Sequence, residues 1–320
     1  MSASRNVLTP EALAMMDVIA RTGSFAAAAR ELGKVPSALT YNVRQLEDAL
    51  DVLLFDRRSR QAKLTAAGVE LLEEGRRLLA QMDAVANRVK RVATGWETQL
   101  TIAVDGIISR VTMYELCEEF FGLEPGPGTR LRLRTEVLAG TWEALVTGQA
   151  DLAIGVSVGP DRAPPGGVQV QPLGEIDFVF AVAPHHPLAS ASAPISEVEL
   201  QRHRAVAVAD SAQRLAPLTV NLLPGQEVFT VATTQAKIEA QIRCLGCGYI
   251  PEPLAREHIA AGRLVVKPTH RAAVPTRFGY AWRSPSHGAP RGSQGLALRW
   301  WLQQLENPAT RKALLERHVG

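Results

Sequence analysis

The sequence predicts a small helical N-terminal region, a long helix and a larger α/β region. Three observations support this division. Up to about residue 93, apolar residues recur with helical spacing between Gly, Ser and Thr punctuation. From residue 99 onward, strand-like apolar runs alternate with helical segments, as in layered α/β folds. A chain of 320 residues with 46% hydrophobic content can build about two domains with sizeable cores.

The chain begins with signals for two short helices. Thr9 can cap a helix whose first residue, Pro10, suits that position, and Gly23 ends it. Ser24 can cap a second helix, SFAAAARELG, whose alanines allow another helix to approach closely before Gly33 stops it. GKVP is then a four-residue turn before a third helix. A small-residue helix, a tight turn and a further helix together predict a helix-turn-helix.

The third helix, which begins at Pro36, has an unusual polar face. Residues spaced i, i+3, i+4 and i+7 share one side of a helix, and this side carries Ser37, Thr40, Tyr41 and Arg44. The opposite side carries Leu39, Val43, Leu46 and Leu50. A solvated face, usually rich in Glu and Lys, is one interpretation. The other is a face for the major groove of DNA, because Arg reads guanine and hydroxyls suit phosphates or base edges.

The segment after this helix is basic. DVLLFDRRSRQAKLT predicts two short strands joined by a basic turn, which is a winged hairpin. Residues 1–95 carry 14 Lys/Arg and 11 Asp/Glu, whereas the remainder carries 21 of each, so the net charge of +3 belongs to the N-terminal part. Such an excess suits a phosphate backbone. The residues expected to contact DNA are Ser24, Pro36, Ser37, Thr40, Tyr41, Arg44, Arg58, Arg60 and Lys63.

A long helix is expected at about 66–93, capped by Thr65. Its apolar residues alternate by four and three, which is a heptad pattern and favours pairing with a second copy of the chain. Packing against its own domain is the alternative. The residues expected at the dimer seam are Leu71, Leu78, Met82, Val85 and Val89.

The roughly 220 residues after position 98 are too many for one sheet and predict two α/β lobes with largely parallel sheets. The expected strands are QLTIAV, RLRLRTEVL, ADLAIG, DFVFAVAP, RAVAVAD, VFTVATT and FGYAWRS, and the expected helices are TWEALVTGQ, 234–245, 292–305 and 309–317. Ligands of such sheets bind beyond the carboxyl ends of the strands, and a cleft between two lobes collects several of these ends.

The N-terminal motifs together resemble a known family. GSFAAAARELGKVPSALTYNVRQLEDALDVLLFDRRSRQAKLTAAG is similar to the DNA-binding domain of LysR-type transcriptional regulators, from the helix-turn-helix to the Thr-x-x-Gly start of the linker helix. GTWEALVTGQADLAIG and APHHPLA resemble stretches of the family's effector domain. The resemblance implies a winged helix, a dimerising linker helix and a two-lobed effector domain of the periplasmic-binding-protein type. It also implies a cytoplasmic dimer or tetramer that binds promoter DNA, a small-molecule effector and RNA polymerase.

The predicted organisation follows these segments. It comprises a winged helix-turn-helix domain at 1–65, the linker helix at 66–93, a hinge at 94–98, a two-lobed effector domain at 99–306 (lobe 1 about 99–173 and 272–306, lobe 2 about 174–271), and a C-terminal helix at 307–320.

Strand ends and helix starts give candidate effector-binding residues: Asp105, Gly106, Ile107, Thr141, Trp142, Asp210, Ser211, Thr233, Thr234, Ile250 and Pro251. Trp142 can stack on a ligand or belong to the core. Asp105 and Asp210 would repel an anion, which favours a neutral, aromatic or amine-bearing effector over a dicarboxylate. The alternative is that either acid caps a helix instead.

Other classes of protein find less support in the sequence. Cys244 and Cys247 have the C-x-x-C spacing of redox or metal sites, so a redox-sensing regulator is one alternative. A solute-binding protein is the other, but no secretory signal is recognisable. We find no Gly-rich phosphate loop and no nucleophile elbow, and we expect no enzyme activity, cofactor, metal site or membrane span. Three cysteines without an even disulfide framework fit a reducing cytoplasm.

Overall fold

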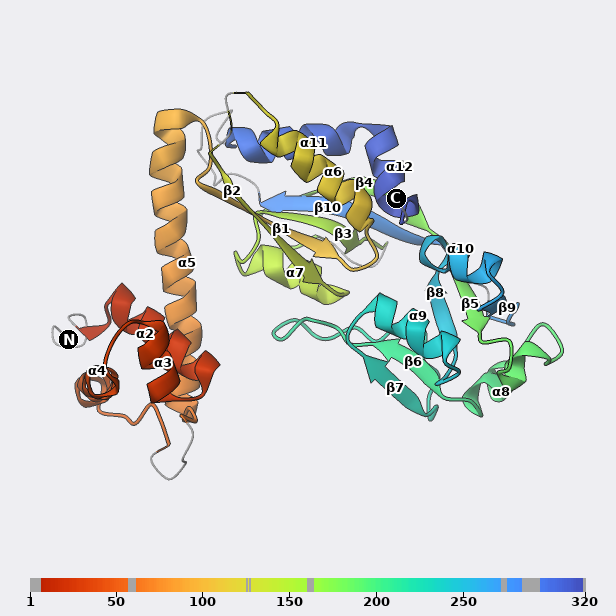
Figure 1. Cartoon of the computed structure of the whole chain (residues 1–320), viewed down its shortest axis with the longest axis horizontal. Helices are drawn as coiled ribbons and strands as arrows, with labels where there is room; N and C mark the ends of the chain where they lie inside the picture. The colour runs from red at the N-terminus through yellow and green to blue at the C-terminus, as the bar shows by residue number, and fades with distance from the viewer. Residues whose placement is uncertain are drawn as a thin grey trace. The chain divides into compact units, whose positions relative to one another are not determined.

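A computed structural model describes residues 7–56, 62–124, 126, 128–159, 164–271, 275–283 and 294–318. The chain forms two compact units, Met1–Val89 and Lys90–Gly320, each with its own hydrophobic core (Figure 1). Among the described residues, no helix is both long and apolar enough to cross a membrane.

The first unit confirms the predicted helices. They are α2 (Pro10–Thr22), α3 (Phe25–Glu31), α4 (Pro36–Leu50) and the greater part of α5 (Ala66–Thr94). Thr9 caps α2 by accepting a hydrogen bond from Ala12 N–H at 3.2 Å. Ser24 caps α3 by accepting one from Ala27 N–H at 3.4 Å. The core of this unit is built from the inward faces of all four helices.

The predicted wing is shorter than a two-stranded hairpin in the part that the structure describes. It contains one antiparallel bridge, between Phe55 and Leu64. The buried carboxylate of Glu47 accepts a hydrogen bond from Leu54 N–H at 2.8 Å and so fastens the start of the wing to α4. The basic tip, with Arg58 and Arg60, lies outside the described residues.

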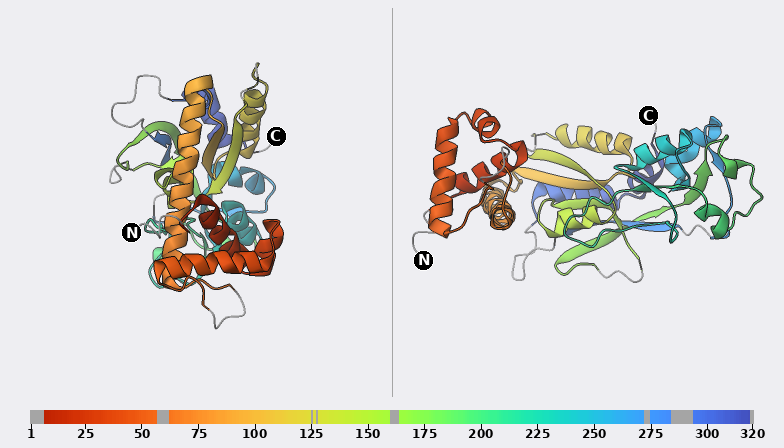
Figure 2. Two further views of the ribbon diagram at one scale, coloured as in Figure 1. Left: turned by 90° about the vertical axis from the view of Figure 1, so that its left-hand side faces the viewer. Right: turned by 90° about the horizontal axis from the view of Figure 1, so that it is seen from below.

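Lobe 1 of the second unit is a sheet covered on both faces. Its strand order is β2-β1-β3-β10-β4, with β1 (Gln99–Asp105), β2 (Arg130–Glu136), β3 (Leu152–Ser157), β4 (Val168–Ile176) and β10 (Thr276–Arg283). The helices α6 (Arg110–Phe121) and α11 (Leu296–Glu306) cover one face, and α7 (Ala139–Val146) covers the other (Figures 1 and 2). The last helix, α12 (Pro308–Glu316), also packs on this lobe.

Lobe 2 contains two small sheets. One has the order β8-β5-β9, from β5 (Phe178–Val182), β8 (Gly248–Pro251) and β9 (Val265–Val266), and the other pairs β6 (Ala205–Val208) with β7 (Val228–Val231). Its helices are the 3₁₀ turn η1 (Pro187–Ala189), α8 (Glu197–Gln201), α9 (Thr234–Ile242) and α10 (Glu252–Ala260).

The prediction of largely parallel sheets was wrong. β1 is parallel to β2 and β3, and β6 is parallel to β7, but β10 runs antiparallel to β3 and β4, and β5 runs antiparallel to β8 and β9. The reason is that the chain returns from lobe 2 as β10 and inserts between β3 and β4. The last strand of lobe 1 before the chain enters lobe 2, β4, continues to Ile176.

Candidate functional site

The helix α4 presents the predicted polar face to solvent. Leu39, Val43 and Leu46 are buried, whereas Ser37, Thr40, Tyr41 and Arg44 are exposed. The Thr40 hydroxyl donates to Pro36 O at 3.0 Å, and the Tyr41 phenol, 62% exposed, accepts from the Gln45 amide at 2.9 Å. Lys63 is also exposed, on the described flank of the wing. The local pattern therefore leaves a phenol and a guanidinium outward on one helix face.

The helix α5 divides into a part that packs on its own unit and a part that does not. Gly68 lies against Leu54 O, where a Cβ would come within 2.1 Å, and Gly75 lies against the Leu13 side chain, where a Cβ would come within 2.9 Å. Leu71 packs on the same core, so the beginning of the predicted dimer seam packs against its own domain. Further along, four residues of the seam are exposed: Leu78 (49%), Met82 (53%), Val85 (49%) and Val89 (66%).

The second region of interest is the inter-lobe junction, which we define as residues 105–107, 136–143 and 209–218. Its centre is the start of α7, where Asp105 is buried beneath the first turn. The Asp105 carboxylate accepts hydrogen bonds from Ile107 N–H at 3.0 Å and Leu138 N–H at 3.1 Å. The buried Thr141 hydroxyl adds a longer one at 3.4 Å. Burial raises the pKa of Asp105 to about 7, although these hydrogen bonds oppose the shift.

A carboxylate from lobe 2 occupies the N-terminus of α7. Asp210 accepts hydrogen bonds from Ala139 N–H at 3.2 Å and Gly140 N–H at 3.1 Å, and from Ala212 N–H and Leu218 N–H of its own loop at 2.9 and 2.7 Å. Free N–H groups and the positive end of the helix dipole make a helix start a natural anion site. In this protein the chain's own side chain fills that site.

Two further contacts fasten the same loop to lobe 1. The Ser211 hydroxyl donates to Glu136 at 2.8 Å and accepts from Val137 N–H at 2.9 Å. The Glu143 carboxylate accepts from the backbone N–H groups of Gln213, Arg214 and Leu215 at 2.7–3.1 Å. These three bonds hold the pKa of Glu143 below its usual value, against the opposing effect of burial.

Comparison with known proteins assigns both units. The family model described as "LysR substrate binding domain" matches residues 93–308, and the model "Bacterial regulatory helix-turn-helix protein, lysR family" matches residues 10–69. The chain belongs to the LysR family. It is a DNA-binding transcriptional regulator with an effector-binding domain, and it is not an enzyme.

Relatives and solved structures agree with this assignment. The probable HTH-type transcriptional regulator YhaJ of Escherichia coli (strain K12) is 40% identical over 306 residues, covering 95% of this chain and 97% of that protein. The uncharacterized regulator YeeY of the same strain is 37% identical over 295 residues, covering 92% of each chain. The crystal structure of CbnR, a LysR family transcriptional regulator, has a TM-score of 0.58 at 18% identity, covering 94% of this chain and 99% of that one, which shows a shared fold.

Within this LysR-type regulator, the structure gathers only some of the predicted effector residues. The start of α7 brings together Asp105, Thr141, Asp210 and Ser211. Nearby, the Gly106 N–H donates a hydrogen bond to Glu136 O at 3.0 Å. Two other predicted residues lie within the junction segments but are buried: Ile107, and Trp142, which is in the lobe 1 core and donates to Ser157 O. The remaining positions lie elsewhere in lobe 2. Pro251 is buried, Ile250 is fully buried in the core, and Thr233 caps α9 next to the buried Thr234.

One polar pair in lobe 2 was missed by sequence reasoning. Lys237 and Gln241 lie one turn apart on the buried side of α9, and burial lowers the pKa of Lys237 to about 8. The Gln241 amide has no hydrogen-bond partner among the described residues. Both side chains point toward Gly248, since a Cβ there would come within 3.1 Å of Gln241 and 3.4 Å of Lys237. Their i, i+4 spacing was visible, but it is equally typical of an exposed helix face.

The cysteines of the LysR-type regulator give little support to redox sensing. All three are free, and Cys247 is buried with its thiol 3.5 Å from Arg204 O. Burial raises the pKa of Cys247 to about 12. Because the thiolate is the reactive form, a thiol in this environment is a poor redox centre.

Proposed function

We propose that the exposed face of α4 reads the major groove of a promoter, with Arg44 contacting base edges and Ser37, Thr40 and Tyr41 contacting phosphates or bases. The observation that carries this proposal is that α4 directs a guanidinium, a phenol and two hydroxyls to solvent while burying its aliphatic side. Pro36 starts the helix, whose first N–H groups can meet a phosphate. Ser24 and Lys63, with Arg58 and Arg60 of the wing tip, are assigned to backbone contacts.

The test is a titration of the full chain against DNA from upstream of its own gene, followed by fluorescence anisotropy. Arg44→Ala is expected to weaken specific binding by about 1–3 kcal/mol and to relax the preference at one base pair. Lys63→Ala should weaken binding to all sequences and flatten the salt dependence. The matched control is Arg202→Ala, which removes an exposed arginine from lobe 2. If Arg44→Ala and Arg202→Ala have the same affinity as the parent, α4 is not the recognition helix.

A second copy of the chain is proposed as the partner of α5. The support is the exposed apolar stripe of Leu78, Met82, Val85 and Val89 on a helix with heptad spacing. Leu78→Asp places like charges at a desolvated seam, so light scattering should show a smaller species and DNA affinity should fall. An unchanged mass would show that α5 does not pair through this stripe. A dimer or tetramer in the cytoplasm, acting with RNA polymerase at the promoter, is the assembly that we propose.

For the effector, we propose a neutral, aromatic or amine-bearing small molecule that binds at the inter-lobe junction. Four carboxyl groups gather there, from Asp105, Glu136, Glu143 and Asp210, and the anion site at the start of α7 already holds Asp210. An added dicarboxylate would meet like charges and an occupied helix start. The sequence predicts this class of effector from Asp105 and Asp210 alone. The helix start occupied by Asp210 is a further reason to expect a ligand that is not an anion.

A thermal-shift screen of the full chain against metabolites of both classes tests this proposal, followed by calorimetry on the hit. Asp105→Asn and Thr141→Val, which both change residues of the junction, should each weaken binding of the hit. Tight binding of a dicarboxylate would place the effector in another class. Affinity equal to that of the parent in both variants would place it at another site.

A further inference from the structure

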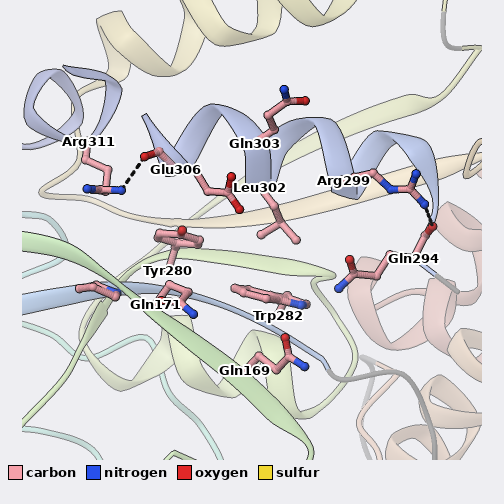
Figure 3. A pocket seen from close by; sticks show the side chains of 11 residues that line it. Gln169, Gln171, Tyr280, Trp282, Gln294, Arg299, Leu302, Gln303, Glu306 and Arg311 are labelled. Carbon is pink, nitrogen blue, oxygen red and sulfur yellow. Dashed lines mark hydrogen bonds between the residues drawn. The ribbon is translucent and has the colours of Figure 1, made fainter. Parts of the chain in front are cut away.

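A hollow of about 680 Å³ opens in lobe 1 and shares no lining residue with the inter-lobe junction. Its floor is the face shared by β4 and β10, and its roof is α11 (Figure 3). The end of α12 closes one side through Arg311. The volume lies within the range of small-molecule sites, roughly 300–1,000 Å³.

The floor of the lobe 1 hollow is aromatic with carboxamides beside it. Tyr280 and Trp282 are two residues apart on β10 and stack with ring centroids 5.9 Å apart at 18°. In the antiparallel register, Tyr280 lies opposite Gln171 and Trp282 lies opposite Gln169, so all four side chains share one face. The two rings are 3% and 7% exposed and are therefore held rigidly by the core beneath them. Only a small part of either ring reaches the hollow, beside amides that can both donate and accept.

The two ends of the hollow differ in charge. At one end, Arg299 donates to Gln294 O at 3.4 Å and forms no ion pair within the described part of the chain (Figure 3). At the other end, Arg311 donates to the main-chain oxygens of Leu305 and Glu306 at 3.2 and 2.9 Å, and the acidic side chain of Glu306 also lines the hollow. The hollow therefore has an excess of one positive charge, with Arg299 as the cation that lacks a nearby acid among the described lining residues.

One buried donor in the lining also lacks an acceptor. Trp282 Nε1–H is buried and has no hydrogen-bond partner among the described residues. A buried N–H without an acceptor is unfavourable, because it has lost its hydrogen bond to water. A ligand oxygen could relieve this cost, and it would do so beside the arginine end of the hollow, where the nitrogen end of the indole points in Figure 3.

We propose that the lobe 1 hollow binds a small planar heteroaromatic carboxylate as a second ligand of this regulator. The carboxylate pairs with the Arg299 guanidinium, whose planar fork matches its two oxygens, and accepts from Trp282 Nε1–H. The ring contacts the small exposed part of Tyr280 and Trp282, and the exposed Gln169 and Gln171 bond to its heteroatoms. This ligand differs in charge from the effector proposed for the inter-lobe junction.

The probes are nicotinate and its neutral isostere nicotinamide, each titrated into the full chain by calorimetry with saturation-transfer NMR as a second measurement. Nicotinate is expected to bind about tenfold more tightly than nicotinamide, because only the carboxylate forms the charge-assisted pair. Arg299→Gln should weaken nicotinate about tenfold and leave nicotinamide unchanged. Trp282→Phe, which keeps a ring and removes the N–H donor, should weaken nicotinate by a smaller factor.

The matched control is Arg277→Gln, which removes an arginine of β10 that pairs with Glu175 at 2.9 Å and does not line the hollow. It should bind nicotinate like the parent. The proposal is overturned if nicotinate gives neither heat nor saturation transfer, if Arg299→Gln and Arg277→Gln bind it equally, or if Asp105→Asn abolishes binding and so places the probe at the junction. Circular dichroism of each variant confirms that it is folded.

Discussion

The inter-lobe junction and the lobe 1 hollow are two polar regions of one domain that satisfy their charges in opposite ways. In the junction, Asp105, Glu143 and Asp210 each accept at least two backbone N–H groups. In the hollow, Arg299 has no ion-pair partner and Trp282 Nε1–H has no acceptor among the described residues. The junction is acidic and occupied by the chain itself, whereas the hollow is basic at one end and open.

This difference predicts which property a substitution changes in each region, the stability of the fold or the affinity for a ligand. A buried carboxylate that satisfies several backbone donors supports the fold, because its removal leaves those donors without partners. A cation at the rim of an open hollow supports only what binds there. Variants of the junction should therefore change stability as well as effector affinity, whereas variants of the hollow should change ligand affinity alone. Tryptophan fluorescence can follow this, since all five tryptophans lie beyond residue 95, in the second unit.

The largest expected effect is the pH dependence caused by Asp105. Burial raises the pKa of its carboxyl from 3.8 to about 7. Between these values the folded state binds a proton that the unfolded chain has lost, so stability falls as the pH rises from about 4 to about 7 and then levels off. The full shift corresponds to a change on the order of 4 kcal/mol in the free energy of unfolding. Asp105→Asn removes this contribution, and urea unfolding of parent and variant across this pH range measures the difference.

Glu143 contributes to the same pH profile with the opposite sign. The pKa of its carboxyl is lowered, so the stability that it adds is present above its unfolded pKa and is lost as the pH falls. Because Glu143 is unchanged in Asp105→Asn, subtracting the two profiles isolates Asp105. Parallel profiles for parent and variant would mean that Asp105 is ionised in the folded state throughout this range.

The second effect concerns the carboxylate that lobe 2 places at the start of α7. Asp210→Ala leaves four N–H groups without this acceptor, at Ala139, Gly140, Ala212 and Leu218. We expect a loss of about 3 kcal/mol in the free energy of unfolding, since water reaches some of the donors. Hydrogen–deuterium exchange of these four amides should accelerate. The control Glu197→Gln removes an exposed acid elsewhere in lobe 2. Equal exchange rates in both variants would show that Asp210 does not hold these amides.

Sequence reasoning predicted part of the junction and none of the hollow. The rule that ligands gather at strand ends and helix starts brought together Asp105, Thr141, Asp210 and Ser211, because each lies at or within three residues of a strand's end or in the first turn of a helix. Leu138 could not be foreseen, since its φ of +54° is fixed by its surroundings rather than by its residue type. The hollow needs β4, which the sequence did not reveal, beside β10 and α11, more than 100 residues later.

The N-terminal unit was easier to predict because its signals are local. Caps, turns and the apolar stripes of α2, α3 and α4 depend on residues within one or two turns of each other. The start of the α5 seam was harder, since the contact of Gly75 with Leu13 joins positions that are 62 residues apart. A heptad pattern alone does not distinguish a partner chain from the chain's own domain.

The third effect tests how tightly the junction is packed. A Cβ at Gly140 would come within 1.8 Å of Ser211 Oγ and 2.9 Å of its Cβ, so Gly140→Ala should push the loop away from α7. Overpacking of this kind costs about 1–3 kcal/mol. Gly106→Ala is the matched control at the same junction, because the nearest atoms would lie at 3.9 Å. Comparable urea midpoints for the two variants would mean that the Ser211 loop moves away from α7 without lowering the free energy of unfolding.

The smallest effect on stability is expected in the lobe 1 hollow. Arg299 is exposed, donates one long hydrogen bond to Gln294 O at 3.4 Å and has no ion pair in the described part of the chain. Replacing it by glutamine removes the charge and leaves a polar side chain with good helix propensity at the same position of α11. The free energy of unfolding should therefore change by less than about 0.5 kcal/mol. Urea unfolding followed by tryptophan fluorescence measures this, with Arg277→Gln, which breaks an exposed pair with Glu175, as the reference.

A larger loss of stability in Arg299→Gln would contradict the proposed difference between the inter-lobe junction and the lobe 1 hollow. It would show that the guanidinium supports the fold as Asp210 does, and a fall in nicotinate affinity could then follow from a loosened α11. A small change in stability combined with a tenfold loss of nicotinate affinity would separate the two effects, because a side chain that supports only a ligand leaves the unliganded domain as it was. Adding nicotinate should then raise the urea midpoint of the parent and not that of the variant.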